Sequence, residues 1–188
     1  MAPIRRAGRA SQPGGATIAW SQAEGARGTR WREAITSAEG LRRSVVLEVS
    51  QAGRVTRLEV TTRNGMLTLH PEPDESGMHG NVVSTDGVRH LAFPWSPSHV
   101  LLLLGSIASA TVELARLAAK LEVGGTTELD VLRIDDALQP TPARWRVARL
   151  DVVDWQLGSL DGAESRHVQL DPNGRPMLPE AADWPLEV

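Results

Sequence analysis

Between residues 43 and 95 the sequence repeats short runs in which apolar and polar residues alternate, separated by turn signals. Alternation with a period of two is typical of a strand that buries one face. The turn signals are Ala52-Gly53, Asn64-Gly65 and Asp86-Gly87, three dipeptides that favour hairpin loops. This region therefore predicts five or more consecutive antiparallel strands.

The first two turns fix the register of these strands independently. A two-residue loop at Ala52-Gly53 pairs Leu47 with Leu58, and one at Asn64-Gly65 pairs Val60 with Leu69. Both registers put Leu58 and Val60 on the same side, as expected of a meander with one buried face. That face carries only apolar side chains, namely Val45, Leu47, Val49, Leu58, Val60, Leu67 and Leu69.

One later stretch has helical periodicity instead. Apolar residues recur at spacings of three and four between Ile107 and Leu121, with Ser106 as a suitable N-cap and Gly124-Gly125 as a stop signal. Shorter strands are expected at 17–20, 29–35, 100–104, 127–134, 145–153 and 166–170. The predicted fold class is therefore mainly β, an antiparallel meander curled into a roll or half-barrel with one covering α-helix at about 106–121.

Length and composition predict one folded domain. The chain has 188 residues, which suffice for a single sizeable core. Residues 1–16 are basic and rich in glycine and proline, so we expect a disordered tail there and a single β-roll domain over 17–188.

Composition also narrows the partners. A net charge of −3 gives no electrostatic reason to expect nucleic acid, and the absence of cysteine excludes disulfides and thiolate metal sites. The longest apolar run, at 100–104, is too short to span a membrane, and no signal peptide is recognisable. We expect a cytoplasmic protein without a cofactor.

Four histidines, at 70, 79, 90 and 99, raise the question of a metal site. In the register of the Asp86-Gly87 turn, His90 lies opposite Val83, which leaves it roughly 13 Å from His79 on the same face. The Asn64-Gly65 register places His70 opposite Glu59. Because zinc needs its ligands at about 2.0–2.3 Å, this spacing predicts no metal site.

Glu33, His90 and His99 are the candidate catalytic residues. Glu33 shares its strand face with Trp31 and Ile35, and burial among such side chains favours a protonated carboxyl that can act as general acid or base. The alternative is a shorter strand with Glu33 in solvent. His90 and His99 flank the sequence FPWSP, whose two prolines interrupt strand pairing.

Tryptophan and His99 supply the candidate ligand contacts. Six tryptophans occur beside one phenylalanine and no tyrosine, and tryptophan suits both protein cores and pocket walls. We predict Trp31, Trp95, His99 and Trp145 as ligand-binding residues, with core packing as the alternative for each tryptophan. We expect Arg89 to Phe93 to be a strand, with His90 on the face opposite Leu91.

Three sequence features together resemble a bacterial family described as glycolipid-binding. They are Trp20 with Glu24, the stretch SVVLEVSQAGRVTRLEVTTRNGMLTL, and the closing LDPNGRPML with WPLE. The resemblance implies a spiral β-roll similar to the half-barrels of lipoprotein carriers. The chain departs from that family where RHLAFPWSPSHVLLLLGS replaces an acidic segment with cysteine, so no catalytic residue carries over.

Three functions remain open from the sequence. The first is binding of an apolar or amphiphilic small molecule in the cavity of a rolled sheet. The second is an isomerase or cyclase of secondary metabolism that uses the same cavity with one acid or base. The third is an interaction module, with a homodimer formed through a sheet edge or the strand at 100–104.

Overall fold

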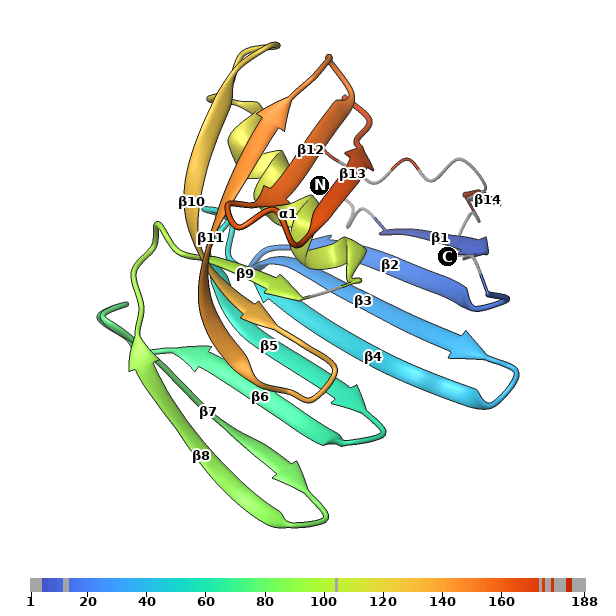
Figure 1. Ribbon diagram of the computed structural model, residues 1–188, viewed down its shortest axis with the longest axis vertical. Coiled ribbons are helices and arrows are strands. Elements are labelled where there is room, and N and C mark those ends of the chain that lie inside the picture. The colour runs from blue at the N-terminus through green and yellow to red at the C-terminus, as the bar shows by residue number, and fades with distance from the viewer. Residues whose placement is uncertain are drawn as a thin grey trace. The chain divides into compact units, whose positions relative to one another are not determined.

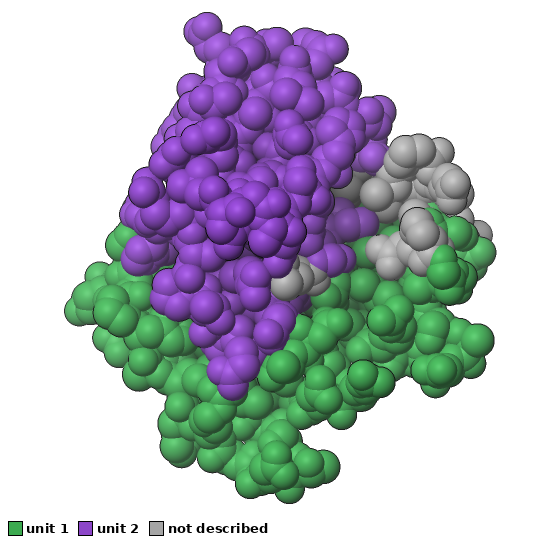
Figure 2. Space-filling model, in the orientation of Figure 1, with its two compact units in different colours: residues 1–97, 136–138, 179–188 green, residues 98–135, 139–178 purple. Residues whose placement is uncertain are grey.

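A computed structural model describes residues 5–11, 14–103, 105–172, 174, 177 and 182–183. The chain divides into two compact units, coloured separately in Figure 2. Unit 1 comprises residues 1–97, 136–138 and 179–188, and unit 2 comprises residues 98–135 and 139–178. The predicted single domain over 17–188 stays a prediction.

Unit 1 is built on a nine-stranded sheet with the order β14-β1-β2-β3-β4-β5-β6-β7-β8, in which every neighbouring pair is antiparallel (Figure 1). This confirms the predicted antiparallel meander. Its strands are β1 (Arg5–Ser11), β2 (Thr17–Gly25), β3 (Gly28–Ser37), β4 (Gly40–Val49), β5 (Val55–Thr62), β6 (Gly65–Pro71), β7 (Gly77–Ser84), β8 (Gly87–Pro94) and β14 (Ala182–Asp183).

The seven aliphatic residues predicted to share a face do so. Their exposed fractions lie between 0% and 6%. We call this side of the unit 1 sheet the apolar face and the other side the polar face. Leu47 pairs with Leu58 and Val45 with Val60, as the Ala52-Gly53 turn predicts.

The other two turns are displaced from their predicted positions by one residue. Arg63 and Asn64 form the second turn, and Gly65 is the first residue of β6 with φ 135°, so Val60 pairs with Leu67 rather than Leu69. Gly87, with φ 115°, occupies the same place in β8. The register therefore shifts by two residues, which keeps each side chain on its predicted face because side chains alternate with a period of two.

Unit 2 contains a five-stranded sheet with the order β13-β12-β11-β10-β9 and forms a curled half-barrel. Its strands are β9 (Val100–Leu103), β10 (Thr126–Ile134), β11 (Pro140–Arg149), β12 (Asp154–Ser159) and β13 (Ser165–Gln169). The expected strand at 145–153 is too long at its end, because β11 ends at Arg149 and residues 150–153 form the connection to β12. Leu104 lies outside the described residues.

The helix of unit 2, α1 (Ile107–Ala118), confirms the predicted helix. The Ser106 hydroxyl accepts a hydrogen bond from the Ser109 N–H, as an N-cap does. The helix connects β9 to β10, and these two strands are parallel. Leu114 and Leu117 pack against the sheet in a core with Trp145, Trp155 and other buried apolar residues.

One expectation from the sequence is wrong. Arg5–Ser11 forms strand β1, paired along its length with β2, and is not part of a disordered tail. Backbone pairing in a sheet does not require large apolar side chains, which explains why a segment poor in them still forms a strand. Residues 1–4 and 12–13 of the expected tail lie outside the described residues. Within the described chain, no helix has the length and apolar character needed to cross a membrane.

Candidate functional site

Three polar side chains are buried on the apolar face of unit 1. Gln22, Glu33 and Arg43 are 8%, 3% and 5% exposed, and they lie on β2, β3 and β4. Strand alternation puts them on this face, since Glu33 pairs directly with Trp20 and with Val45. We call these three residues the buried polar cluster.

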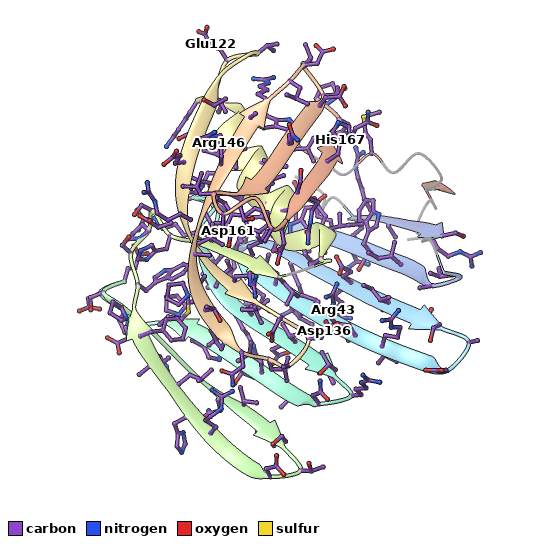
Figure 3. The ribbon with its side chains drawn as sticks, viewed as in Figure 1. Arg43, Glu122, Asp136, Arg146, Asp161 and His167 are labelled. Atoms are coloured by element: carbon purple, nitrogen blue, oxygen red, sulfur yellow. The ribbon has the colours of Figure 1, made fainter. Side chains whose placement is uncertain are left out.

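Glu33 and Arg43 form an ion pair within this cluster. The Arg43 Nη2 atom lies 3.5 Å from Glu33 Oε1, and the Glu33 side chain is 0% exposed while that of Arg43 is 6% exposed. Arg43 Nη1 also donates to Asp136 Oδ1 at 3.3 Å, and Asp136 is largely exposed. Figure 3 shows Arg43 and Asp136 side by side. The guanidinium thus lies between a buried and an exposed carboxylate.

Asp136 reaches this position because residues 136–138 pack on unit 1, although they lie between β10 and β11 in the chain. The Asp136 carbonyl oxygen accepts hydrogen bonds from Thr62 Oγ1 at 3.2 Å and Asn64 Nδ2 at 2.9 Å. Leu138 is fully buried, with φ 60°. A left-handed leucine is unfavourable by itself, so its packing and these hydrogen bonds hold the loop in place.

Two tryptophans flank the polar cluster. The ring centroids of Trp20 and Trp31 are 5.9 Å apart, with their planes tilted by 41°. Trp31 pairs with Gln22 across β2 and β3, and Gln22 Nε2 donates to Glu24 Oε1 at 3.1 Å. The Trp20 Nε1 atom is buried and has no hydrogen-bond partner among the described residues.

This arrangement differs from an ordinary apolar core. A charged pair that is withdrawn from water costs desolvation energy, and its mutual attraction only partly offsets that cost. A few convergent polar groups within an apolar and aromatic lining are characteristic of small-molecule sites. The buried polar cluster, with Trp20 and Trp31, is therefore the candidate site.

The predicted catalytic residues Glu33 and His90 lie on opposite faces of the unit 1 sheet. Glu33 lies buried on the apolar face, which confirms that it is not in solvent. His90 is exposed on the polar face, where its Nδ1 atom is 2.5 Å from Asn81 Oδ1. The prediction that His90 lies on the face opposite Leu91 is confirmed, but His90 pairs with Asn81 and not with Val83. His99 is half-buried in unit 2, in the segment before β9.

The predicted ligand contacts are distributed over both units. Trp31 and Trp95 belong to unit 1 and are 3% and 8% exposed. The backbone N–H of Trp95 donates to the Ser76 carbonyl oxygen at 3.1 Å, and this hydrogen bond anchors the proline-rich connection. His99 and Trp145 belong to unit 2, and Trp145 is part of the core beneath α1. As one ligand site, this set stays a prediction.

The sequence interpretation missed Gln22, Arg43 and Asp136. Alternation could have found the first two, because Gln22 follows Ile18 and Trp20 at even spacing, as Arg43 precedes Val45 and Leu47. Asp136 has no such local signal. For metals, the described part of the chain contains no group of three histidine, cysteine, aspartate or glutamate side chains placed to hold an ion.

A crystal structure of a DUF1089-family protein from Pseudomonas aeruginosa is similar to this chain, with a TM-score of 0.55 and 17% sequence identity. The match covers 94% of this chain and 88% of that chain. At this identity the likeness shows the fold alone, and it supports the half-barrel that the sequence resemblance implies. No family model and no curated protein matches. Membership of the glycolipid-binding family stays a prediction.

Proposed function

We propose that this protein binds an amphiphilic small molecule on the apolar face of unit 1. The observation that carries the proposal is the Glu33–Arg43 ion pair, which is buried in a face that is aliphatic and aromatic apart from Gln22. The apolar tail of the ligand takes the place of the protein atoms that now bury the aliphatic side chains of β4 to β6. The buried polar cluster binds the polar head.

Charge and hydrogen-bonding capacity favour a hydroxylated head. The Arg43 guanidinium already contacts two carboxylates, those of Glu33 and Asp136, so an anionic head would have to compete with both for it. Hydroxyl groups donate to carboxylates and accept from guanidinium, amide and indole N–H groups, and Trp20 Nε1 is an unused donor among the described residues. The paired rings of Trp20 and Trp31 add a flat apolar surface.

Native mass spectrometry and solvent extraction of freshly purified protein test whether an amphiphile is bound. Selectivity is tested with a fluorescent apolar dye, displaced either by octyl glucoside or by 1-octanol. We expect octyl glucoside to displace the dye at a concentration about tenfold lower, a difference of about 1.4 kcal/mol in binding free energy.

The matched variants are the double substitution Glu33→Met/Arg43→Met and the single substitution Glu48→Gln. The double variant removes the buried pair and should abolish the preference for the glucoside. Glu48 pairs with Arg30 between the same two strands but on the polar face, so Glu48→Gln should preserve the preference. A protein that carries no lipid and releases no dye to either compound contradicts the proposal. The isomerase or cyclase alternative stays a prediction without a supporting observation.

A further inference from the structure

The polar face of unit 1 gathers three of the five histidines. His70, His79 and His90 lie on β6, β7 and β8, three adjacent strands. His70 is the direct cross-strand partner of His79, and their ring centroids are 6.1 Å apart with planes tilted by 34°. The connection between β6 and β7 sets this pairing, whereas the register predicted from the sequence concerned only the β5 side of His70.

The separation of the two rings is close to that of a bidentate metal site. Two imidazoles that share a tetrahedral zinc ion, each nitrogen at about 2.0–2.1 Å, have ring centroids about 5 Å apart. His79 is exposed and His70 half-buried, so small side-chain rotations can bring the rings together at little cost. Neutral imidazole is a good ligand for Zn²⁺, Cu²⁺ and Ni²⁺.

A carboxylate lies beside the pair. Glu72 follows His70 by two residues, and its N–H donates to the Gly77 carbonyl at 2.8 Å, which continues the pairing of β6 with β7. A Cβ atom built on Gly77 would lie 2.8 Å from Glu72 Cδ, so this carboxyl group lies over a backbone position two residues from His79. The spacing of two residues along a strand is about 6.6 Å, within reach of an extended glutamate.

We infer that His70 and His79 bind a divalent transition-metal ion, with Glu72 as a third protein ligand and water completing the coordination. Two imidazoles, a carboxylate and water form a donor set that Zn²⁺ accepts. Glu72 moves to the ion on binding, because the three groups do not yet converge. The site is on the face opposite the buried polar cluster, so it does not depend on the proposed binding of an amphiphile.

The surrounding charges are compatible with a cation. On β5, the strand next to β6, Arg57 and Glu59 form an ion pair with each other, which compensates the charge of that guanidinium. On β7 and β8, Asn81 and His90 contact one another. His90 therefore lies on the same face of the sheet as His70 and His79 without being part of that pair, and its substitution provides the matched control for the metal-binding variants.

Isothermal titration of the full-length, tag-free chain with Zn²⁺ tests the inference, and Co²⁺ absorption reports the ligand set. We expect one equivalent to bind, and His70→Asn or His79→Asn to weaken binding by at least about tenfold, with a smaller loss for Glu72→Gln. His90→Asn should leave the affinity within about twofold. Zn²⁺ should raise the thermal midpoint of the parent and of His90→Asn, but not that of His70→Asn/His79→Asn.

Two results would overturn the inference. The first is no heat and no midpoint shift at millimolar Zn²⁺. The second is binding that survives in His70→Asn/His79→Asn, or that His90→Asn weakens equally, which would place the metal elsewhere. Circular dichroism of each metal-free variant shows whether it is folded, and these exposed or half-buried positions tolerate asparagine. Dye displacement should be unchanged in all these variants, whether or not they bind Zn²⁺.

Discussion

Replacing Arg43 with methionine is expected to destabilise the protein strongly, because it leaves the Glu33 carboxylate buried without its cation. At the observed 3.5 Å separation and an effective dielectric constant of about 20, the attraction between the two charges is about 5 kcal/mol. Removal of one partner from a buried pair typically costs about 3–5 kcal/mol. We expect the free energy of unfolding to fall by that amount.

Glu33→Gln should cost less, about 1–3 kcal/mol, because Arg43 keeps its contact with the exposed Asp136. The double variant Glu33→Met/Arg43→Met should recover most of the loss of Arg43→Met, since apolar residues of similar volume replace a buried pair at little cost. The control Glu48→Gln disrupts a partly exposed pair on the polar face and should cost about 1 kcal/mol or less.

Urea melts of the four variants measure these differences, and the single variant Glu33→Met completes the double-mutant cycle for Glu33 and Arg43. The refuting result is an Arg43→Met variant that loses no more stability than Glu48→Gln, because then the pair is not desolvated in solution. A double variant with native stability but without glucoside preference would separate the ligand-binding role of the pair from its packing role.

Four further substitutions test other parts of the fold. Arg149→Met should lower the free energy of unfolding in urea melts by about 2–3 kcal/mol. Arg149 donates to two carbonyls at the end of α1, and its guanidinium lies 5.2 Å from the centroid of the Trp155 ring. An unchanged urea midpoint would refute this prediction. Burial raises the pKa of the Glu113 carboxyl group, although Arg116 opposes this shift. The protonated form of Glu113 is therefore favoured in the folded protein, and its contribution to stability is present at low pH and is lost as pH rises through the raised pKa. Glu113→Gln should therefore raise the thermal midpoint at neutral pH and give no gain in acid, and a gain that persists in acid would contradict the assignment. Gly87→Ala should cost roughly 1–2 kcal/mol for its left-handed backbone alone. Gly65→Ala should cost clearly more, because a Cβ added at Gly65 would also lie 2.2 Å from the Val83 carbonyl oxygen. Equal losses of stability in thermal melts of the two variants would refute this contact.

The buried face of unit 1 could be predicted because strand alternation is local. The face on which a side chain lies depends only on its position in the alternating backbone. The apolar residues from Val45 to Leu69 were therefore assigned to the correct face, even though two turns were displaced. A shift of one residue would have inverted the face, whereas the observed shift of two did not. The same alternation placed Glu33 inside and His90 outside.

The turn displacement nevertheless changed which side chains are neighbours. With Gly65 as a strand residue rather than a loop residue, Glu59 pairs with Thr68 and not with His70. The pairing of His70 with His79 is set by the separate connection between β6 and β7, whose register was not predicted. Turn type is decided by small differences in backbone energy that hydrophobic patterning does not encode. The proposed metal site was therefore invisible in the sequence.

The apolar face, the helix at Ile107–Ala118 and its Ser106 cap were determined by the sequence alone, because each depends on residues within a few positions of one another. Tertiary structure alone decided the parallel pairing of β9 with β10 and the contact of Arg43 with Asp136, which are 93 residues apart in the chain. Such contacts depend on how distant segments close together, and the balance of loop entropy and burial that selects them leaves no local periodic signal.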